Sequence, residues 1–285
     1  MKRSQFRFLD RLRVRWAEVD MQKIVFNAHY LMYFDTAVAG YWRALAMPYH
    51  EAMEHLQGDL YVRKATLEYL GSARYDDRLD VGVRLARVGT SSCRFEAAVF
   101  RGDLCLVHGD LVYVFADPAT QTSKPVPPAL RTLFEDFERG DVMVRTRTAS
   151  WAEVGAACRD IRQTVLVDEL GTPAALAGDD DDEAAVHVLA LNRFDMALGC
   201  GRLLRRSDSV AQIGRVATLA SMRGSGIGTQ VLAALVDAAR QRAVRVLMLT
   251  ARADAVSLYE RAGFQASGPI YDEAGLPHVE MRFTL

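Results

Sequence analysis

The residues with the clearest chemical potential form a glycine-rich turn in the second half of the chain. Residues 223–228 read Arg-Gly-Ser-Gly-Ile-Gly, between an alternating apolar stretch at 215–219 and an apolar run of helical spacing that includes Val231. Glycines let backbone N–H groups approach a negatively charged group closely, and a helix N-terminus adds its positive dipole end. The turn therefore predicts a site for a phosphate or a pyrophosphate.

Two familiar nucleotide-binding patterns do not fit this turn. No Lys-Ser or Lys-Thr pair closes it, which argues against a P-loop. The acidic residue that a dinucleotide fold needs about 20 residues further on is missing, because residues 242–249 are only basic or apolar. The pattern that remains is Arg-x-x-Gly-x-Gly. Since glycine-rich turns are often purely structural, the turn alone leaves that alternative open.

Strands and helices must position the turn. A strand at 210–219 leads into it, and the helix that follows carries apolar residues at i, i+3 and i+4 spacing. The run of five acids at 179–183 is interpreted as a solvated turn, with binding of a cationic substrate as the alternative. The other predicted strands of this half are 142–148, 186–191, 198–204, 244–250 and 279–285, and the other predicted helices are 151–166 and 255–262.

The first half follows a different pattern. Residues 6–19 alternate between apolar and charged types, which predicts a half-exposed strand, and residues 28–45 carry an aromatic stripe typical of a core helix. A long helix followed by antiparallel strands is an α+β arrangement. Four strands and a short helix are predicted after it, at 60–70, 79–88, 92–101, 104–115 and 130–138.

Composition limits the class of protein. A chain of 285 residues predicts one or two domains, and a change of composition near residue 140 divides it into 1–140 and 141–285. The net charge of -1 gives no reason to expect binding to nucleic acid or to a membrane. The four cysteines show no CxxC pair, so we expect free thiols, no metal site and, without an apolar leader or span, a cytoplasmic protein.

The first half, over about residues 6–139, resembles the hotdog-fold acyl-CoA thioesterases of the 4-hydroxybenzoyl-CoA thioesterase type. The family pattern is Asp-x-x-Gly-x-Val-x-x-x-x-Tyr, which Asp20, Val25 and Tyr30 match, while Lys23 replaces the usual glycine. The resemblance also rests on three further segments, residues 15–20, 67–70 and 74–77. It implies a long helix wrapped by an antiparallel sheet, and a homodimer or homotetramer formed through this domain.

The resemblance also implies a site. Asp20 would act as general base on water or attack the thioester carbonyl itself, and a backbone N–H at Asn27 would hold the oxyanion. A helix-flanking turn residue is the structural alternative for Asp20. Lys23 would crowd the thioester pocket or bring a charge beside Asp20. The turn at 89–92 is either a plain hairpin or a contact to coenzyme A (CoA) held by a neighbouring subunit.

The second half, over about residues 143–285, resembles the GNAT superfamily of acyl-CoA N-acyltransferases, which implies a mixed α/β fold. Besides the Arg-x-x-Gly-x-Gly turn, residues 249–252 and 257–264 are similar to the later strand and helix of that superfamily. Residues 271–281 are similar to the C-terminal signature of a small bacterial GNAT subgroup. The resemblance implies that the turn holds the pyrophosphate of acetyl-CoA.

Site residues are implied here as well. The backbone at Val216, Ala217 and Thr218 would pair with the pantetheine arm, and Tyr259 would protonate the departing thiolate, with a core-packing role as its alternative. Glu273 and His278 are candidates for the base that deprotonates the amine. The pyrophosphate would lie on Arg223, Gly224, Ser225, Gly226, Ile227, Gly228 and Thr229.

Three functions follow from these resemblances. The first is a bifunctional CoA-dependent enzyme that hydrolyses acyl-CoA thioesters and transfers an acyl group to an amine. The second is a GNAT acetyltransferase whose hotdog domain is a non-catalytic dimerisation scaffold or acyl-CoA sensor, which the departure at Lys23 favours. The third is a CoA-binding regulator without enzymatic activity.

Overall fold

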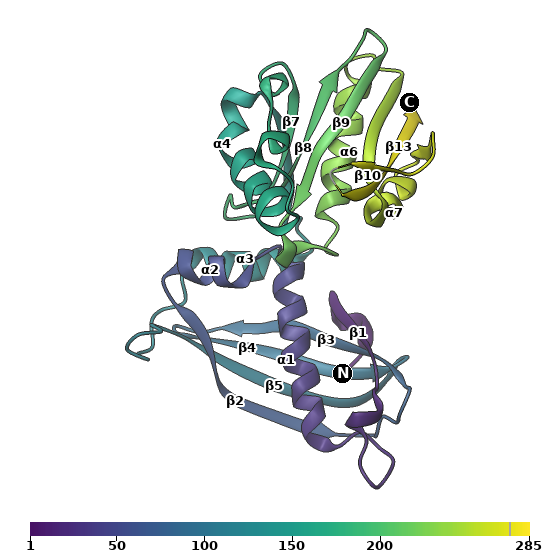
Figure 1. Cartoon of the computed structure of the whole chain (residues 1–285). Helices are drawn as coiled ribbons and strands as arrows, with labels where there is room; N and C mark the ends of the chain where they lie inside the picture. The colour runs from purple at the N-terminus through teal and green to yellow at the C-terminus, as the bar shows by residue number, and fades with distance from the viewer. Residues whose placement is uncertain (274) are drawn as a thin grey trace. The chain divides into compact units, whose positions relative to one another are not determined.

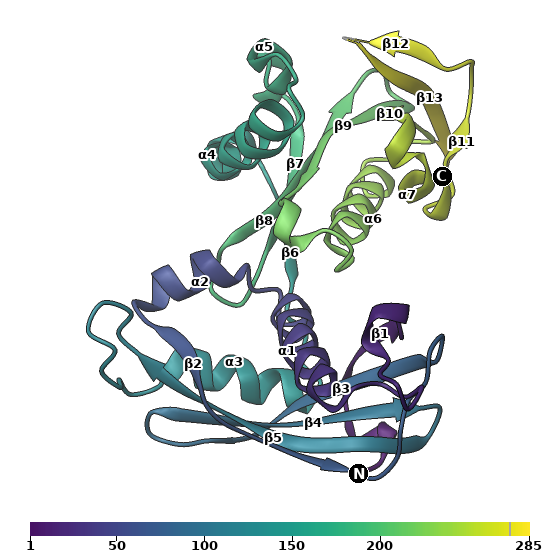
Figure 2. The same cartoon turned by 60° about the horizontal axis from the view of Figure 1, so that its bottom comes forward.

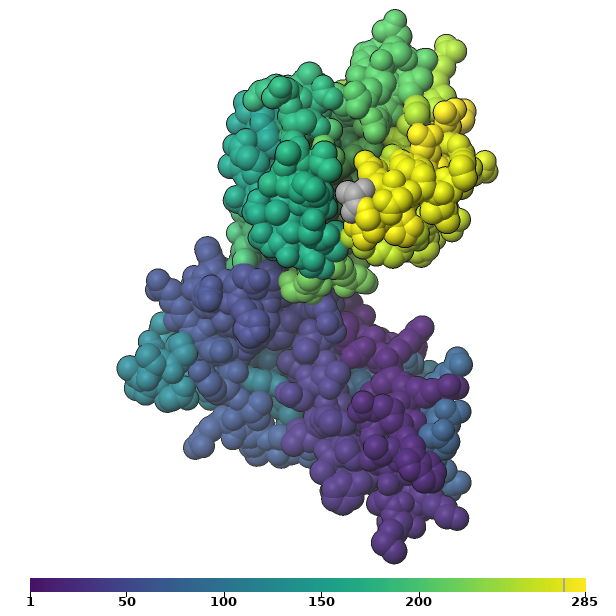
Figure 3. All heavy atoms as spheres, viewed as in Figure 1, coloured from purple at the N-terminus to yellow at the C-terminus, as the bar shows by residue number. Residues whose placement is uncertain are grey.

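The chain divides between Met143 and Val144 into two units, which the computed structural model describes over residues 1–273 and 275–285. Ala274, part of the 271–281 signature, lies outside the described residues. Figure 3 distinguishes the units by colour, from the purple and blue of the first to the green and yellow of the second. The expected helix and antiparallel sheet of the first unit and the expected mixed α/β fold of the second are confirmed.

The first unit is built on one long helix, α1 (Asn27–Ala44), which packs on a five-stranded antiparallel sheet of order β1-β3-β4-β5-β2 (Figure 1). Its aromatic stripe is buried, and the Tyr41 ring lies 5.7 Å from that of Phe95. Edge-on ring contacts of this kind stabilise beyond their buried area. The strands are β1 (Phe8–Arg13), β2 (Asp59–Tyr69), β3 (Arg78–Val88), β4 (Ser92–Arg101) and β5 (Leu104–Ala116).

Two shorter helices complete this unit, α2 (Tyr49–Leu56), which the sequence analysis does not predict, and α3 (Pro128–Arg139). The expected strand at 6–19 is too long, because β1 ends at Arg13 and a 3-10 turn occupies Trp16–Glu18. The Glu18 carboxylate accepts the Arg15 N–H at 2.8 Å, and such a cap favours a turn over an extended strand.

The second unit has a sheet of order β11-β13-β10-β9-β8-β7-β6, with β12 paired to β13. The pair β9 and β10 is parallel, and the other described pairs are antiparallel. The strands are β6 (Arg145–Ala149), β7 (Val186–Leu191), β8 (Ala197–Arg205), β9 (Val210–Thr218), β10 (Val246–Arg252), β11 (Gln265–Ala266), β12 (Tyr271–Glu273) and β13 (Leu276–Thr284).

Helices cover both faces of this sheet, as Figure 2 shows for α4 (Trp151–Arg162) and α6 (Ile227–Arg240). Successive residues of β8 point to opposite faces of the sheet, so each face has a helix to cover it. Cys200 packs in the core cluster under α4, whereas a Cβ at Gly201 would meet Leu235 of α6. The helix predicted at 151–166 continues beyond Arg162 as a π-helix, Gln163–Glu169. The remaining helices are α5 (Ala174–Ala177) and α7 (Val256–Arg261).

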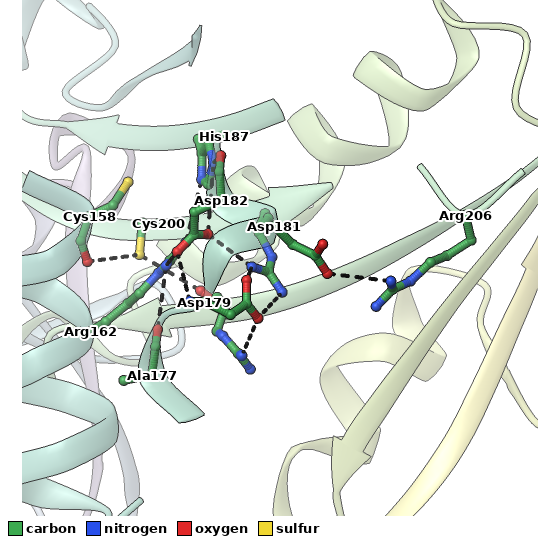
Figure 4. A network of polar contacts seen from close by, with 11 residues as sticks. Cys158, Arg162, Ala177, Asp179, Asp181, Asp182, His187, Cys200 and Arg206 are labelled. Carbon is green, nitrogen blue, oxygen red and sulfur yellow. Dashed lines mark hydrogen bonds and ion pairs between the residues drawn. The ribbon is translucent and has the colours of Figure 1, made fainter. Parts of the chain in front are cut away.

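Four of the five residues of the acidic run are exposed, as a solvated turn requires, but the interpretation is wrong for Asp182. Asp182 is 2% exposed, and its carboxylate pairs with Arg162 at 2.7 Å and with Arg202 at 3.0 Å (Figure 4). Asp179 pairs with Arg202 and, at 2.9 Å, with Arg215. A buried guanidinium needs a counter-charge, and the acidic run supplies it from a distant part of the chain.

Among the described helices, none combines the length and the apolar character that crossing a bilayer requires.

Candidate functional site

Strands β9 and β10 pair only at their beginning. The parallel register runs from Val210 opposite Val246 to Gln212 opposite Met248 and goes no further in the described pairing. Beyond it, the Val216–Thr218 segment is paired on its other edge, where Ala217 lies opposite Cys200. One edge of this segment therefore offers backbone N–H and C=O groups to a ligand.

The glycine-rich turn follows this edge directly. Gly224 has φ +78° and Gly226, the N-cap of α6, has φ +85°, a conformation that L side chains avoid. The helix that begins at Ile227 presents unpaired N–H groups towards the turn, as any helix start does. The Ile227 side chain is buried, so this residue offers only its backbone to a ligand, while Thr229 is exposed.

The Arg223 side chain already forms an ion pair within the chain. Its guanidinium makes a two-point ion pair with Glu169, the last residue of the π-helix, with Nη2 and Oε2 2.7 Å apart. The Arg223 hydrogen bond, offset by slight burial, holds the pKa of Glu169 below its usual value. The sequence analysis missed Glu169, because its partner lies 54 positions further along the chain.

Tyr259 lies on α7, beside the turn. A Cβ at Gly228 would stand 3.6 Å from Leu258, the residue before Tyr259, which places the start of α6 against α7. Tyr259 is 8% exposed and packs edge-on to Phe264, with ring centres 6.2 Å apart. Burial raises the pKa of Tyr259 to about 12, so the phenol keeps its proton at neutral pH.

The two candidate bases lie on the β12–β13 hairpin. Glu273 stands opposite Leu276 in the register, and His278 stands opposite Tyr271. One ring nitrogen of His278, Nδ1, lies 2.9 Å from the Leu276 carbonyl, which fixes the ring. The Glu273 side chain is exposed, and that of His278 is partly so.

In the first unit, Asp20 opens a tight turn before α1. Its N–H donates to the Ile24 carbonyl at 2.9 Å, its carbonyl accepts the Lys23 N–H at 3.0 Å, and a bridge between Val19 and Val25 closes the turn. Oδ1 of Asp20 accepts the Gln22 N–H at 2.8 Å, an Asx turn that fixes the carboxylate. This bond is also what a purely structural turn residue makes.

Lys23 occupies a left-handed backbone conformation, with φ +62°. The glycine of the family pattern adopts this conformation without strain, whereas a lysine pays about 1 kcal/mol or more for it. The Lys23 side chain is exposed. The turn thus keeps its shape despite the departure from the pattern.

Asn27 is the first residue of α1, where the N–H groups have no acceptor within the helix. Its carbonyl accepts the Tyr69 hydroxyl at 3.2 Å, which ties the helix start to β2. An oxyanion close to this N–H would also meet the positive end of the helix dipole.

Glu18 anchors this region and was missed in the sequence, although its spacing to Arg15 is that of a capping pair. It is 3% exposed, its carboxylate accepts the Tyr33 hydroxyl at 2.7 Å, and its carbonyl accepts the Phe26 N–H at 2.9 Å. Burial raises its pKa, but the hydrogen bonds from Arg15 and Tyr33 outweigh this and hold the pKa below its usual value.

The turn at 89–92 is a hairpin whose Gly89 N–H donates to the Ser92 carbonyl at 2.7 Å. Ser91 also lines a pocket of about 540 Å³, together with Arg63 of β2 and Ser123. Among residues 1–273 and 275–285, no three His, Cys, Asp or Glu side chains are arranged to hold a metal ion.

Comparison with known proteins assigns each half separately. Residues 14–134 match the family described as the thioesterase-like superfamily, and residues 163–285 match the acetyltransferase (GNAT) domain. The uncharacterized N-acetyltransferase YjcF of Bacillus subtilis is 29% identical over 122 residues, which are 42% of this chain and 86% of that protein.

The first half is similar to the acyl-CoA thioesterase YbgC of Haemophilus influenzae, at 24% identity over 127 residues, which are 45% of this chain and 93% of that protein. Among solved structures, the 1,4-dihydroxy-2-naphthoyl-CoA thioesterase of Synechocystis is 15% identical with a TM-score of 0.42, and the match covers 46% of this chain and 97% of that one. The chain joins a hotdog domain of the thioesterase-like superfamily to a GNAT acetyltransferase domain, two families that use CoA-linked substrates.

Proposed function

We propose that this protein is a bifunctional CoA-dependent enzyme, with a thioesterase domain in residues 1–140 and an N-acyltransferase domain in residues 141–285. One observation carries the proposal furthest. The unpaired edge of β9 at Val216–Thr218 runs directly into a glycine turn that opens the helix α6. An extended amide-bearing arm that ends in a pyrophosphate, as in CoA, matches this order of backbone groups.

In the second domain, the acceptor amine attacks the thioester carbonyl carbon of acetyl-CoA. An amide C–N bond forms, the C–S bond breaks, and the sulfur leaves as a thiolate that takes the Tyr259 proton. A phenol whose pKa is raised to about 12 by burial is fully protonated at neutral pH. The amine passes its own proton to a base, for which Glu273 and His278 are the candidates.

In the first domain, Asp20 takes a proton from water, and the hydroxide attacks the thioester carbonyl; direct attack by the carboxylate is the alternative route. The N–H of Asn27 holds the developing oxyanion at the start of α1. One such donor is worth about 3 kcal/mol in an acyl-transfer site. The Asx turn at Gln22 aims the Asp20 carboxylate.

A homodimer or homotetramer through the first domain is part of the proposal. The strand β2 ends the sheet order and spans Asp59–Tyr69, and a long free edge of this kind favours pairing with another chain. Large apolar side chains are exposed around the Asp20 turn and the start of α1, as partner-covered surfaces are. They are Trp16, Met21, Phe26, Leu31, Met32, Tyr69, Leu70 and Tyr75.

The test assays the intact chain for both reactions. Release of free thiol from a panel of acyl-CoA esters without amine reports the thioesterase, and acetyl-CoA turnover with a panel of amines reports the transferase. We expect Asp20→Ala to abolish the first activity and to spare the second, and Tyr259→Phe to do the reverse. Absence of both activities, together with no heat on titration with CoA, overturns the proposal.

The alternative is an acetyltransferase with a non-catalytic hotdog domain. The strained backbone at Lys23 favours this alternative, because the chain departs from the family pattern at the turn that carries Asp20. Thiol release that is identical in the wild type and in Asp20→Ala selects this alternative. Analytical ultracentrifugation of Asp20→Ala then shows whether the domain still assembles.

A further inference from the structure

A bulge in β9 carries Arg215 at one end of the edge that is proposed to bind CoA. The β8–β9 register slips between Cys200 and Arg202, where three steps of β9 face two of β8, and Arg215 in this bulge has φ +53°. A bulge of this kind re-aims the side chains of its strand. Because the glycine turn would hold the pyrophosphate, the arm of CoA would run back along the Val216–Thr218 edge, and its thioester would end beside Arg215.

Arg215 and Val216 lie on opposite faces of the sheet. Gly201 faces α6, and a Cβ there would stand 3.4 Å from the Val216 side chain, so Val216 belongs to the apolar packing under α6. The Arg215 guanidinium instead pairs with Asp179 at 2.9 Å, in the charged cluster under α4. Since the donor arm would fill the edge in the plane of the sheet, the acceptor amine must reach the thioester from a face. The polar face under α4 is the one that suits it.

The charged cluster on this face is not balanced. Three guanidinium groups, of Arg162, Arg202 and Arg215, face two carboxylates, of Asp179 and Asp182 (Figure 4). Both Asp179 oxygens accept from Arg202, and Arg215 shares one of them. One positive charge is therefore left over. A buried charge without a counter-charge is costly, so the cluster favours one further anion.

Two further groups beside the cluster do not change this balance. Asp181 is paired with Arg206 at 3.4 Å, so the two charges cancel. His187 Nε2 lies 2.9 Å from the Asp182 carbonyl and donates to it, while Nδ1 lies 3.4 Å from an Arg162 nitrogen. Because a guanidinium only donates, Nδ1 accepts, and the ring is neutral.

Arg215 is the member of the cluster that a ligand can reach. Its side chain is 24% exposed, against 2% for Arg162 and 7% for Arg202. Within the described residues its guanidinium makes one hydrogen bond, from Nη2 to Asp179, although it has five N–H groups to donate, and its Nε has no partner there. Burial and the nearby Arg202 guanidinium hold the pKa of Arg215 below its usual value, against the effect of Asp179. A carboxylate is the planar anion that a guanidinium binds with two parallel hydrogen bonds.

We propose that Arg215 selects the acceptor of acyl transfer, and that this acceptor carries a carboxylate near its amine, as an amino acid does. The inference rests on the proposed function, because CoA bound along β9 is what puts the thioester beside Arg215. The carboxylate pairs with the free N–H groups of Arg215 and supplies the missing negative charge. The amine is then held beside the thioester carbonyl that it attacks. Arg215 itself neither gains nor loses a proton in this step.

The first test compares matched acceptors, with acetyl-CoA and the intact chain. Each α-amino acid of a panel is paired with its carboxamide, which has the same side chain and amine but no carboxylate. We expect at least one amino acid whose kcat/KM exceeds that of its carboxamide about tenfold or more, the worth of hydrogen bonds to a charged group. Equal or faster turnover of the carboxamides overturns the inference, while the proposed acyl transfer then stands.

The second test changes Arg215. Arg215→Gln leaves two arginines facing two aspartates, so thermal stability should not fall. We expect KM for the amino acid to rise about 10- to 100-fold, with little change in kcat, in KM for acetyl-CoA or in turnover of carboxamides. Arg215→Lys keeps the charge and should keep the preference for a carboxylate. Arg206→Gln, which removes an exposed arginine paired to the same acidic run, is the matched control and should behave as wild type. Equal losses with both kinds of acceptor in Arg215→Gln overturn the inference.

Two further arms separate the remaining outcomes. If Arg215→Gln impairs transfer from succinyl-CoA to an amine without a carboxylate, but spares transfer from acetyl-CoA to amino acids, the anion belongs to the acyl chain and the acceptor assignment is overturned. If no amine is acetylated, the proposed transferase function fails. Calorimetric titration of the protein in excess CoA with the same amino acids then decides: binding that is lost in Arg215→Gln supports the inference, and no binding contradicts it.

Discussion

Arg223 and Glu169 form an ion pair that joins the first residue of the glycine turn to the last residue of the π-helix. The pair is half exposed, so it contributes only a few tenths of a kcal/mol to about 1 kcal/mol. In the proposed complex, the guanidinium must turn from this carboxylate to a pyrophosphate. Glu169 thus competes with the ligand for Arg223.

Removing this competitor should strengthen CoA binding. We expect Glu169→Gln to lower the dissociation constant of CoA by about two- to fivefold, the worth of an exposed ion pair. Isothermal titration calorimetry measures it. Asp237→Asn, which breaks the exposed Asp237–Arg240 pair on α6, is the control for net charge. Weaker binding by Glu169→Gln would mean that the pair positions Arg223 for the ligand.

Gly228→Ala separates ligand contact from folding. A Cβ at this position would stand 3.5 Å from Thr218 and 3.6 Å from Leu258, ordinary contacts that the fold accepts. Alanine also favours a helix over glycine by about 1 kcal/mol, so thermal stability should stay or rise. If the pyrophosphate lies against this backbone, CoA affinity should nevertheless fall about tenfold or more. Unchanged affinity would place the pyrophosphate elsewhere.

Tyr259→Phe should separate turnover from binding. Phenylalanine keeps the ring that packs on Phe264 but removes the proton donor. We expect kcat for acyl transfer to fall about 100-fold, as for the loss of a general acid, with little change in KM for acetyl-CoA. Steady-state kinetics with a saturating amine check this. An increase in KM with an unchanged kcat would mean that Tyr259 only packs against its neighbours.

Lys23→Gly should stabilise the first domain. Glycine relieves the left-handed strain at φ +62° but adds entropy to the unfolded chain, so the net gain should be about 0.5–1 kcal/mol. Met21→Gly, in the same exposed turn, is the control and should destabilise. Urea unfolding followed by tryptophan fluorescence gives both values. A loss of stability in Lys23→Gly would mean that the lysine side chain contributes contacts that exceed the strain.

Asp182→Asn should destabilise the second domain in a pH-dependent way. Burial raises the pKa of Asp182, but Arg162 and Arg202 outweigh it, so the folded pKa lies below the unfolded value of about 3.9. Its contribution is therefore present above that value and is lost as the pH falls through the folded pKa.

At pH 7 the substitution leaves guanidinium groups buried without their carboxylate, which costs about 3–5 kcal/mol. We expect this difference from the wild type to shrink as urea unfolding is repeated at decreasing acidic pH. A difference that is constant down to the lowest pH at which the protein folds would assign the effect to shape and not to charge.

Local patterns in the sequence were sufficient to predict most of the helices and strands. The strand Ser92–Arg101 and the strand Val186–Leu191 have the bounds that the sequence predicted. The α1 helix begins one residue before the predicted start. The glycine turn was visible because glycine is the residue that tolerates φ +78° and +85°. In each case, residues close together in the sequence are enough to predict the element.

Tertiary structure alone decided how the charged side chains are paired. Asp182 meets Arg162 from 20 positions away, and Glu169 meets Arg223 from 54 positions away. Composition could equally place these acids in water, as the solvated-turn interpretation did. The fold decides otherwise because α4, β7, β8 and β9 bring three guanidinium groups to one side of a sheet, and burial there makes every unpaired charge expensive.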